Sequence, residues 1–384
     1  MSLIEEIVAM QEEFIAIRRQ IHQEPEIGFE EVKTSKLVAE KLRECGYEVH
    51  TGIGKTGVVG VLKKGDSPKK IGLRADMDAL PMLEDNDLPY KSQNMGKMHA
   101  CGHDGHSASL LLAAKYLATQ DFNGTLNLYF QPAEEGLGGA KAMLEEGLLE
   151  KFDSDFIFGW HNMPLGTDKK IYLKSGAIMA SADSYTIEIK GQGGHGSAPE
   201  KCKDPIVAAS LLVVALQSIV SRNIDPQHSA VVSVGAFNAG NTFNIIPDRA
   251  VLKLSVRALD AKSQEMVAER IKEIAKGVAL AHEIEIEITK QSAAPVTIND
   301  PKATAFAQEV AKEVFGEESC CFEHPAAMGS EDFGYFAQKR PCAYAFLENE
   351  NTHYIHTSTY VFNDALLTRA ASYYARLVLK YLGC

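Results

Sequence analysis

Five side chains that could bind a metal ion lie in the stretch 98–106, which reads MHACGHDGH. Imidazole, thiolate and carboxylate groups suit zinc and neighbouring divalent transition metals. Cys101 and His103 are two positions apart, so an extended backbone would direct both side chains to one side. The intervening and following glycines would let the backbone bend closely around an ion. A single Cys or His is more often an ordinary buried residue, so the stretch alone leaves both interpretations open.

Further candidate ligands follow predicted strands. Asp76 comes after an apolar run at 71–75, and His161 comes after another at 156–160. Glu134 and Glu135 follow a third run at 125–131. Ligands of open α/β sheets bind at the carboxyl ends of the strands, so these side chains are expected to gather at one edge.

The number of candidates favours two metal ions. The candidate ligands are Cys101, His103, Glu135, His161 and a late histidine, either His353 or His356. A catalytic zinc has about three protein ligands and a water molecule, so five ligands suit two ions with a shared ligand. Cys101 could be that shared ligand.

Glu134 and Glu135 would then have different roles. In an extended segment adjacent side chains diverge, so we expect Glu135 to bind metal and Glu134 to act as general base on the attacking water. Such a pair is usually only a solvated loop. Pro132 before it and Gly136 after it, at a strand end, favour a built site.

Composition restricts the class of protein. A chain of 384 residues suggests two domains, and a net charge of −12 argues against nucleic acid or an anionic membrane as partner. The N-terminus is unlike a signal peptide, and the apolar window 205–220 is interrupted by polar residues, which favours a buried helix over a membrane span. Seven cysteines without a secretion signal suit the cytoplasm.

The order of predicted elements indicates an α/β protein. An amphipathic helix at 4–21 and a helix at 31–44 precede strands at 58–62, 71–75, 125–131 and 156–160, with helices at 107–118 and 139–146 between them. This alternation predicts a largely parallel sheet. From about residue 182 the order becomes strand, helix, two strands, helix, strand, which is ferredoxin-like α+β. We therefore expect a catalytic domain of residues 1–181 and 293–384, interrupted by a smaller domain at 182–292.

The inserted domain carries three polar candidates. His195 lies in a glycine-rich turn, where a histidine is most often simply exposed, although a closing domain could use it on a developing oxyanion. Asn244 lies on the same domain. Arg257 ends an otherwise apolar strand and suits a substrate carboxylate, although an ordinary cross-strand ion pair is equally consistent.

Several motifs occur together and in order along the chain. They are HACGHD at 99–104, QPAEEG at 131–136, GWHN at 159–162, GGHGSAP at 193–199, NIIPD at 244–248 and GSEDF at 329–333, with a last segment from His356 to Asp364. They resemble the amidohydrolase branch of the metallo-aminoacylase and carboxypeptidase superfamily over essentially the whole chain. Within the branch they are most similar to bacterial hippurate hydrolases.

The resemblance implies a site and a reaction. It implies two divalent metal ions per subunit, held by Cys101, His103, Glu135, His161 and, of the two late histidines, His356. It implies Glu134 as base, His195 and Asn244 as lid residues, and Arg257 as a carboxylate-binding residue. It also implies a metallopeptidase-like catalytic domain with a lid and dimerisation domain, in a homodimer or higher homo-oligomer.

The implied substrate is a small N-acyl amino acid, with N-benzoylglycine (hippurate) first. N-acetyl-amino acids, N-acetyl-diaminopimelate and small peptides are the alternatives. A non-catalytic metal- or ligand-binding protein and a hydrolase with Cys101 as nucleophile are rivals of a different class. Glu134 beside the ligands disfavours the first rival, and indifference to chelators would mark the second.

One motif departs from the superfamily. The wider superfamily has a metal-binding His-x-Asp early in the chain, where this sequence has Arg74-Ala75-Asp76. Arginine cannot bind the metal, so Asp76, like Asp104, is expected only to orient ligands. Metal selectivity could then be relaxed from zinc toward manganese, cobalt or nickel.

Overall fold

The computed structural model describes residues 2–350 and 352–383 and divides into two compact units. The first comprises Met1–Ile178, Ile298–Pro325 and Asp332–Cys384, and the second comprises Met179–Thr297 and Ala326–Glu331. The predicted insertion, 182–292, falls within the second unit. The short segment 326–331, which the sequence assigned to the catalytic domain, belongs to the second unit as well.

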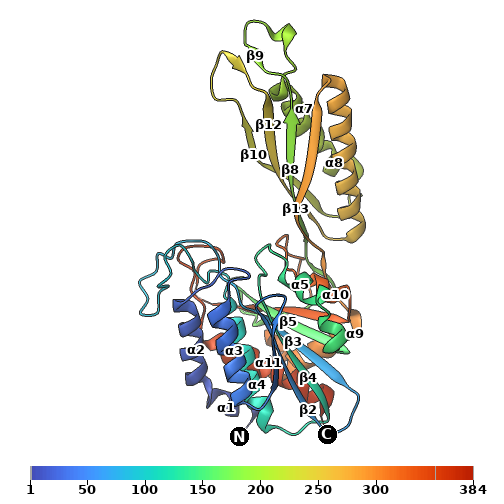
Figure 1. The fold of residues 1–384 in the computed structure, drawn as a ribbon. Coiled ribbons are helices and arrows are strands. Elements are labelled where there is room, and N and C mark those ends of the chain that lie inside the picture. Colours follow the sequence, from blue (N-terminus) through green and yellow to red (C-terminus); the bar gives the residue numbers. More distant parts are fainter. Residues whose placement is uncertain (1, 351, 384) are drawn as a thin grey trace. The chain divides into compact units, whose positions relative to one another are not determined.

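The first unit is built on an eight-stranded sheet (Figure 1). In spatial order the strands are β1 (Glu48–Ile53), β2 (Gly57–Lys64), β4 (Gly124–Gln131), β3 (Lys70–Asp76), β5 (Phe156–Met163), β16 (Cys342–Glu348), β6 (Ile171–Tyr172) and β15 (Cys320–Cys321). The central strands β4, β3, β5 and β16 are parallel to one another, whereas β1 and β2 pair antiparallel, and β6 is antiparallel to β16 but parallel to β15. The predicted α/β class with a largely parallel sheet is confirmed.

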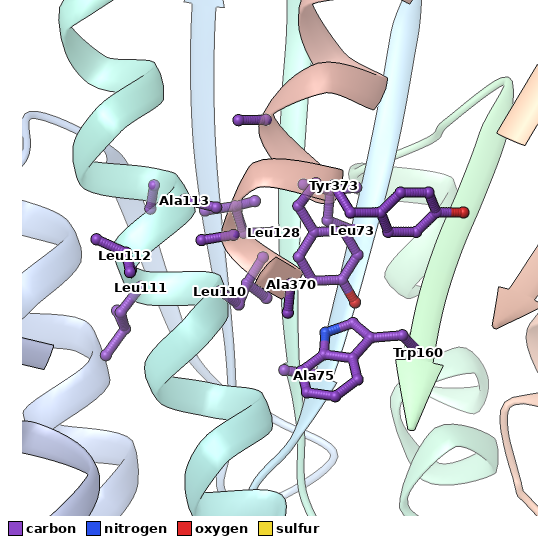
Figure 2. Packing of buried hydrophobic residues seen from close by; sticks show 14 of the residues in the cluster. Leu73, Ala75, Leu110, Leu111, Leu112, Ala113, Leu128, Trp160, Ala370 and Tyr373 are labelled. Atoms are coloured by element: carbon purple, nitrogen blue, oxygen red, sulfur yellow. The ribbon is translucent and has the colours of Figure 1, made fainter. Parts of the chain in front are cut away.

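Apolar helices cover this sheet. α4 (His103–Thr119) and α11 (Ala365–Leu382) pack against each other and against β3. Their fully buried Leu110 and Ala370 meet Leu73 and Trp160 of the strands (Figure 2). Burying each of the two leucines contributes roughly 1.5–3 kcal/mol, which helps to fix the strand ends that carry the candidate ligands.

The N-terminal helix differs from its prediction. The single helix expected at 4–21 is two helices, α1 (Leu3–Val8) and α2 (Gln11–Gln23). Ile7, Phe14 and Ile21 are all buried, so the apolar period continues across the break. Periodicity alone therefore could not locate the turn.

The second unit has the predicted ferredoxin-like order. Its sheet contains β10 (Ala230–Ala239), β12 (Arg249–Ala258), β8 (Ser181–Lys190) and β13 (Glu285–Ala294), all antiparallel and in that spatial order. α7 (Pro205–Ser218) and α8 (Ala261–His282) pack on one another and on this sheet (Figure 1). Their buried side chains form a hydrophobic core separate from that of the first unit.

α7 is less buried than expected. The segment Pro205–Asn223 is the only described helix long and apolar enough to cross a membrane by length and composition, and 33% of its window is buried. Ala208, Leu212 and Leu216 pack into the core, whereas Leu211 and Val214 are 48% and 69% exposed. The predicted buried helix is therefore buried along one face, because α7 has one apolar face inward and another outward.

The remaining helices and strands complete the two units. They are α3 (Val32–Glu44), α5 (Gly139–Glu145), α6 (Leu148–Lys151), β7 (Gly176–Met179), β9 (Gly194–His195), β11 (Ile245–Ile246), β14 (Thr297–Asn299), α9 (Pro301–Phe315) and α10 (Gly334–Ala337), with short irregular helices at Pro199–Lys201, Ile219–Asn223 and Glu317–Ser319.

Candidate metal centre and active site

The candidate ligands of the first unit gather at the carboxyl edge of its sheet. Asp76 is the last residue of β3, and Glu134 and Glu135 lie in the turn after β4. His161 differs slightly from its prediction, because β5 continues to Met163 and His161 lies inside the strand. The predicted gathering at one edge otherwise agrees with the structure.

The sequence suggested an extended link between Cys101 and His103, but in the structure this link is not extended. His103 is the first residue of α4, and Gly102 before it has a left-handed backbone with φ of +94°. A side chain at Gly102 would also meet the Asn162 amide, since an added Cβ would lie 2.3 Å from Asn162 Nδ2. Only glycine satisfies both conditions without strain.

Two groups of possible ligand atoms share Cys101. Cys101, His103 and His161 form one group and Cys101, Glu135 and His356 form the other, with ligand atoms within 4.8 Å of one another in each. Cys101 Sγ lies 3.2 Å from His161 Nε2 and 3.3 Å from His356 Nε2. His356 Nε2 lies 3.3 Å from Glu135 Oε1. The other late histidine, His353, is exposed, and its Nδ1 lies 3.1 Å from the Thr359 carbonyl oxygen.

The histidine tautomers leave lone pairs directed into the cluster. His103 Nδ1 donates to the Asp78 carbonyl oxygen at 2.9 Å, and His161 Nδ1 donates to the Asn162 carbonyl oxygen at 2.5 Å. In its neutral form each ring therefore carries its lone pair on Nε2. His103 Nε2 and Glu135 Oε1 are buried without a hydrogen-bond partner among the described residues. Unsatisfied buried acceptors of this kind fit a divalent cation.

The electrostatics of the cluster also favour a cation. Burial, together with the Glu135 and Glu134 carboxylates, raises the pKa of the Cys101 thiol well above its ordinary value. Burial alone would lower the pKa of His103, but Asp76, Asp78 and Glu135 raise it to about 10. The site therefore has an excess of negative charge, and a bound cation would be needed to hold Cys101 as a thiolate.

Asp78 is a residue that the sequence reasoning missed. Its Oδ1 accepts from the Glu134 backbone N–H at 2.9 Å, its Oδ2 accepts from the Glu135 N–H at 3.0 Å, and Oδ1 lies 3.3 Å from His103 Nδ1. One carboxylate thus fixes the proposed base and two proposed ligands. The signal was a second acidic residue just past β3, two positions after Asp76.

The turn of the acidic pair is not extended. Ala133 has φ of +53°, and its N–H donates to the buried Glu31 carboxylate at 2.8 Å. This held turn, and not strand geometry, therefore sets the directions of Glu134 and Glu135. Glu134, Glu135 and His103 still place ligand atoms within 4.8 Å of one another.

The two carboxylates expected to orient ligands support different elements. Asp76 Oδ1 lies 2.6 Å from His106 Nδ1, and its Oδ2 accepts from Arg74 Nη1 at 2.6 Å. Asp104 is fully buried and is bonded by Arg18 and His22 of α2, each at 2.9 Å. Asp76 thus supports the cluster from the sheet, and Asp104 ties the first turn of α4 to α2.

The second unit brings two of its three candidates together. β9 and β11 pair so that His195 faces Ile245, next to Asn244. Ser197 N–H and Oγ–H both point to His195 Nδ1, at 3.2 and 2.7 Å, so the His195 proton lies on Nε2. Arg257 lies near the carboxyl-terminal end of β12, whereas Asn244 lies before its amino-terminal end. The Arg257 Nη1 donates to Ser330 Oγ at 2.8 Å.

Sequence comparisons with known proteins agree with the family resemblance of the motifs. The profile of peptidase family M20/M25/M40 matches residues 72–380. The chain is 69% identical over 382 residues to a hippurate hydrolase of Campylobacter jejuni, with complete coverage of both chains, and 36% identical to an N-acetyl-L-cysteine deacetylase of Bacillus subtilis, covering 94% of this chain and 86% of that one.

Solved structures agree. An aminohydrolase from Staphylococcus aureus superposes with a TM-score of 0.92 at 34% identity, covering 99% of each chain. A Bacillus subtilis protein described as a dinuclear metal-binding peptidase superposes with a TM-score of 0.82 at 33% identity, covering 97% of this chain and 98% of that one. These findings confirm the resemblance seen in the sequence motifs and the prediction of a hydrolase acting on amide bonds. The chain belongs to peptidase family M20/M25/M40.

Proposed function

We propose that this protein hydrolyses the amide of N-acyl amino acids, with N-benzoylglycine as the preferred substrate, at a site holding two divalent metal ions. The observation that carries the proposal is the sharing of Cys101 by two groups of ligand atoms. One ion would be held by Cys101, His103 and His161, and the other by Cys101, Glu135 and His356. Bound there, the ions would supply Lewis acidity to water and to the amide carbonyl.

Glu134 is the general base of the proposed reaction. It takes a proton from the attacking water and delivers it to the leaving amine. Asp78 holds the backbone N–H groups of Glu134 and Glu135, so the base and a ligand keep a fixed relative position. The Nε2–H of His195 suits donation to a developing oxyanion, and the guanidinium of Arg257 suits the substrate carboxylate.

The substrate preference rests on similarity. The 69% identity to a hippurate hydrolase spans the whole chain, whereas the N-acetyl-L-cysteine deacetylase is 36% identical. N-acetyl-amino acids, N-acetyl-diaminopimelate and small peptides remain the alternative substrates of the same chemistry.

Rates on N-benzoylglycine and N-acetylglycine, measured at equal concentration with purified protein, test this preference. The proposal expects the benzoyl compound to be cleaved faster. Faster release of glycine from the acetyl compound would transfer the assignment to the deacetylase alternative.

The proposed assembly is a homodimer. Arg257 pairs with Ala182 at the amino-terminal end of β8. His195 belongs to β9, which lies beyond the carboxyl-terminal end of β8 at Lys190 (Figure 1). At about 3.3 Å per residue, this separation along β8 is roughly 25 Å, which is longer than an N-acyl amino acid. One copy therefore cannot place both side chains on one substrate, and the proposal takes them from two copies. The outward apolar face of α7 and the edge strand β10 offer a surface for the second copy.

A cytoplasmic location completes the proposal. The six described cysteines are all free, which suits a reducing compartment.

A further inference from the structure

Asn162 lies just after His161 in β5 and is completely buried. Its side-chain oxygen accepts from the Tyr360 hydroxyl and from Asn349 Nδ2, the latter at 3.1 Å. Its side-chain nitrogen donates to the Cys101 carbonyl oxygen at 2.6 Å and to His106 Nε2 at 3.0 Å. All four hydrogen-bonding positions of the amide are thus used, and they determine its orientation.

The acceptor role of His106 is fixed by its other nitrogen. His106 Nδ1 faces the Asp76 carboxylate at 2.6 Å and therefore carries the proton. Its Nε2 accepts from both the backbone N–H and the side-chain amide of Asn162, at 3.2 and 3.0 Å. The orientation of Asn162 is thus anchored through His106 to the end of β3.

Three proposed ligands lie next to Asn162. Its side-chain amide bonds the Cys101 backbone directly, whereas its backbone carbonyl oxygen, which any residue at 162 would supply, receives the Nδ1 proton of His161. Its side-chain oxygen also accepts from Tyr360, which lies in the loop that follows His356. The His356 backbone N–H donates to the Ala100 carbonyl oxygen at 2.8 Å. The close approach of the amide requires glycine at 102, where an added Cβ would lie 2.3 Å from Asn162 Nδ2 and 2.7 Å from the Tyr360 hydroxyl.

We propose that Asn162 is a positioning residue that holds Cys101 where both metal ions can share its sulfur. The proposal rests on the proposed function, since it assumes that Cys101 binds metal. It goes further by giving the shared ligand a specific, fully bonded support in the GWHN motif. Outer partners of this kind typically change metal affinity by about 10- to 100-fold when they are mutated.

The test compares Asn162→Asp with Asn127→Asp. The first substitution keeps the size and the acceptor oxygen of the side chain but places an oxygen against the Cys101 carbonyl. Asn127 is a matched control, because it is buried and its Nδ2 donates to the Asp153 carbonyl oxygen at 2.8 Å and Ser154 Oγ at 3.1 Å, in the amino-terminal half of β4. The readouts are cobalt(II) affinity, the near-ultraviolet thiolate-to-cobalt charge-transfer band, and the unfolding midpoint of the metal-free protein.

We expect both variants to lose stability but only Asn162→Asp to lose about 10- to 100-fold in cobalt affinity and to weaken the thiolate band. If Asn162→Asp does not fold, Tyr360→Phe removes one bond to the same amide and should shift both metal readouts in the same direction. Wild-type affinity and an unchanged band in the folded variant would overturn the proposal. Absence of the band from the wild-type protein would instead overturn the shared-ligand assignment, and with it the proposed function.

Discussion

At the scale of single residues, the proposed chemistry depends on the division of work between Glu134 and Glu135. Asp78 holds both backbone N–H groups, and Glu135 places an oxygen 3.3 Å from His356 Nε2. The sequence suggested this division from adjacency alone. The support by Asp78 was missed, because an acidic residue just past β3 does not by itself reveal which backbone N–H groups of the turn after β4 it accepts from.

Glu134→Gln tests the base. The amide cannot accept the proton of water, so we expect the turnover number to fall about a hundred- to ten-thousand-fold, while bound metal stays unchanged. Metal analysis of the purified variant, together with hippurate hydrolysis, measures both. Glu145→Gln, on α5, should leave both unchanged. Appreciable activity in Glu134→Gln would exclude this residue as the base.

At the scale of elements, most of the fold could be predicted from the sequence. Four strands of the central sheet, β2, β3, β4 and β5, were predicted from their apolar runs, and the ferredoxin-like order was predicted from the succession of strands and helices. The start of α4 at His103 and the end of β5 at Met163 were not predicted, since Gly102 and His161 are placed by tertiary contacts with the site. The outward face of α7 was also missed, because an apolar sequence does not say which faces are covered.

The contact of α2 with α4 has a pH-dependent component. His22 is buried between Asp104, at 2.9 Å, and Glu84, at 3.2 Å. Burial alone would lower the pKa of His22, but the hydrogen bonds to both carboxylates raise it to about 9. A pKa raised by folding contributes stability that is complete below about pH 6.5 and is lost as the pH rises through about 9.

Urea unfolding of the metal-free protein between pH 6 and 10 measures this component. We expect the free energy of unfolding to fall by up to about 3 kcal/mol over this range through His22. His22→Gln should lack that part of the decrease, whereas His282→Gln, at the end of α8, should retain it. Parallel pH profiles for the wild-type protein and His22→Gln would show that this histidine does not carry the charge.

At the scale of the whole molecule, the proposed dimer makes each site composite. His195→Ala and Arg257→Ala should each be nearly inactive alone, since each lacks one proposed contact with substrate. Co-expression should restore about one quarter of the wild-type rate, because half of the dimers are mixed and each mixed dimer has one intact site. Hippurate hydrolysis by the co-purified pair measures the recovery.

Val214→Glu provides the control for this experiment. It places a charge on the outward face of α7, where Val214 is 69% exposed, and should leave the fold intact. Carried by both partners, it should produce monomers and abolish the recovery. No recovery from the original pair, despite demonstrated mixed dimers, would mean that His195 and Arg257 do not act on one substrate from two copies.

The most direct test of the central claim is hippurate hydrolysis before chelation, after chelation, and after zinc, manganese or cobalt is added back. A site in which two ligand groups share Cys101 predicts that activity disappears with the metal and returns with at least one of the three ions. The ion that restores the highest rate would then name the working metal. Hippurate turnover that survives complete removal of metal, verified by elemental analysis, would contradict the account.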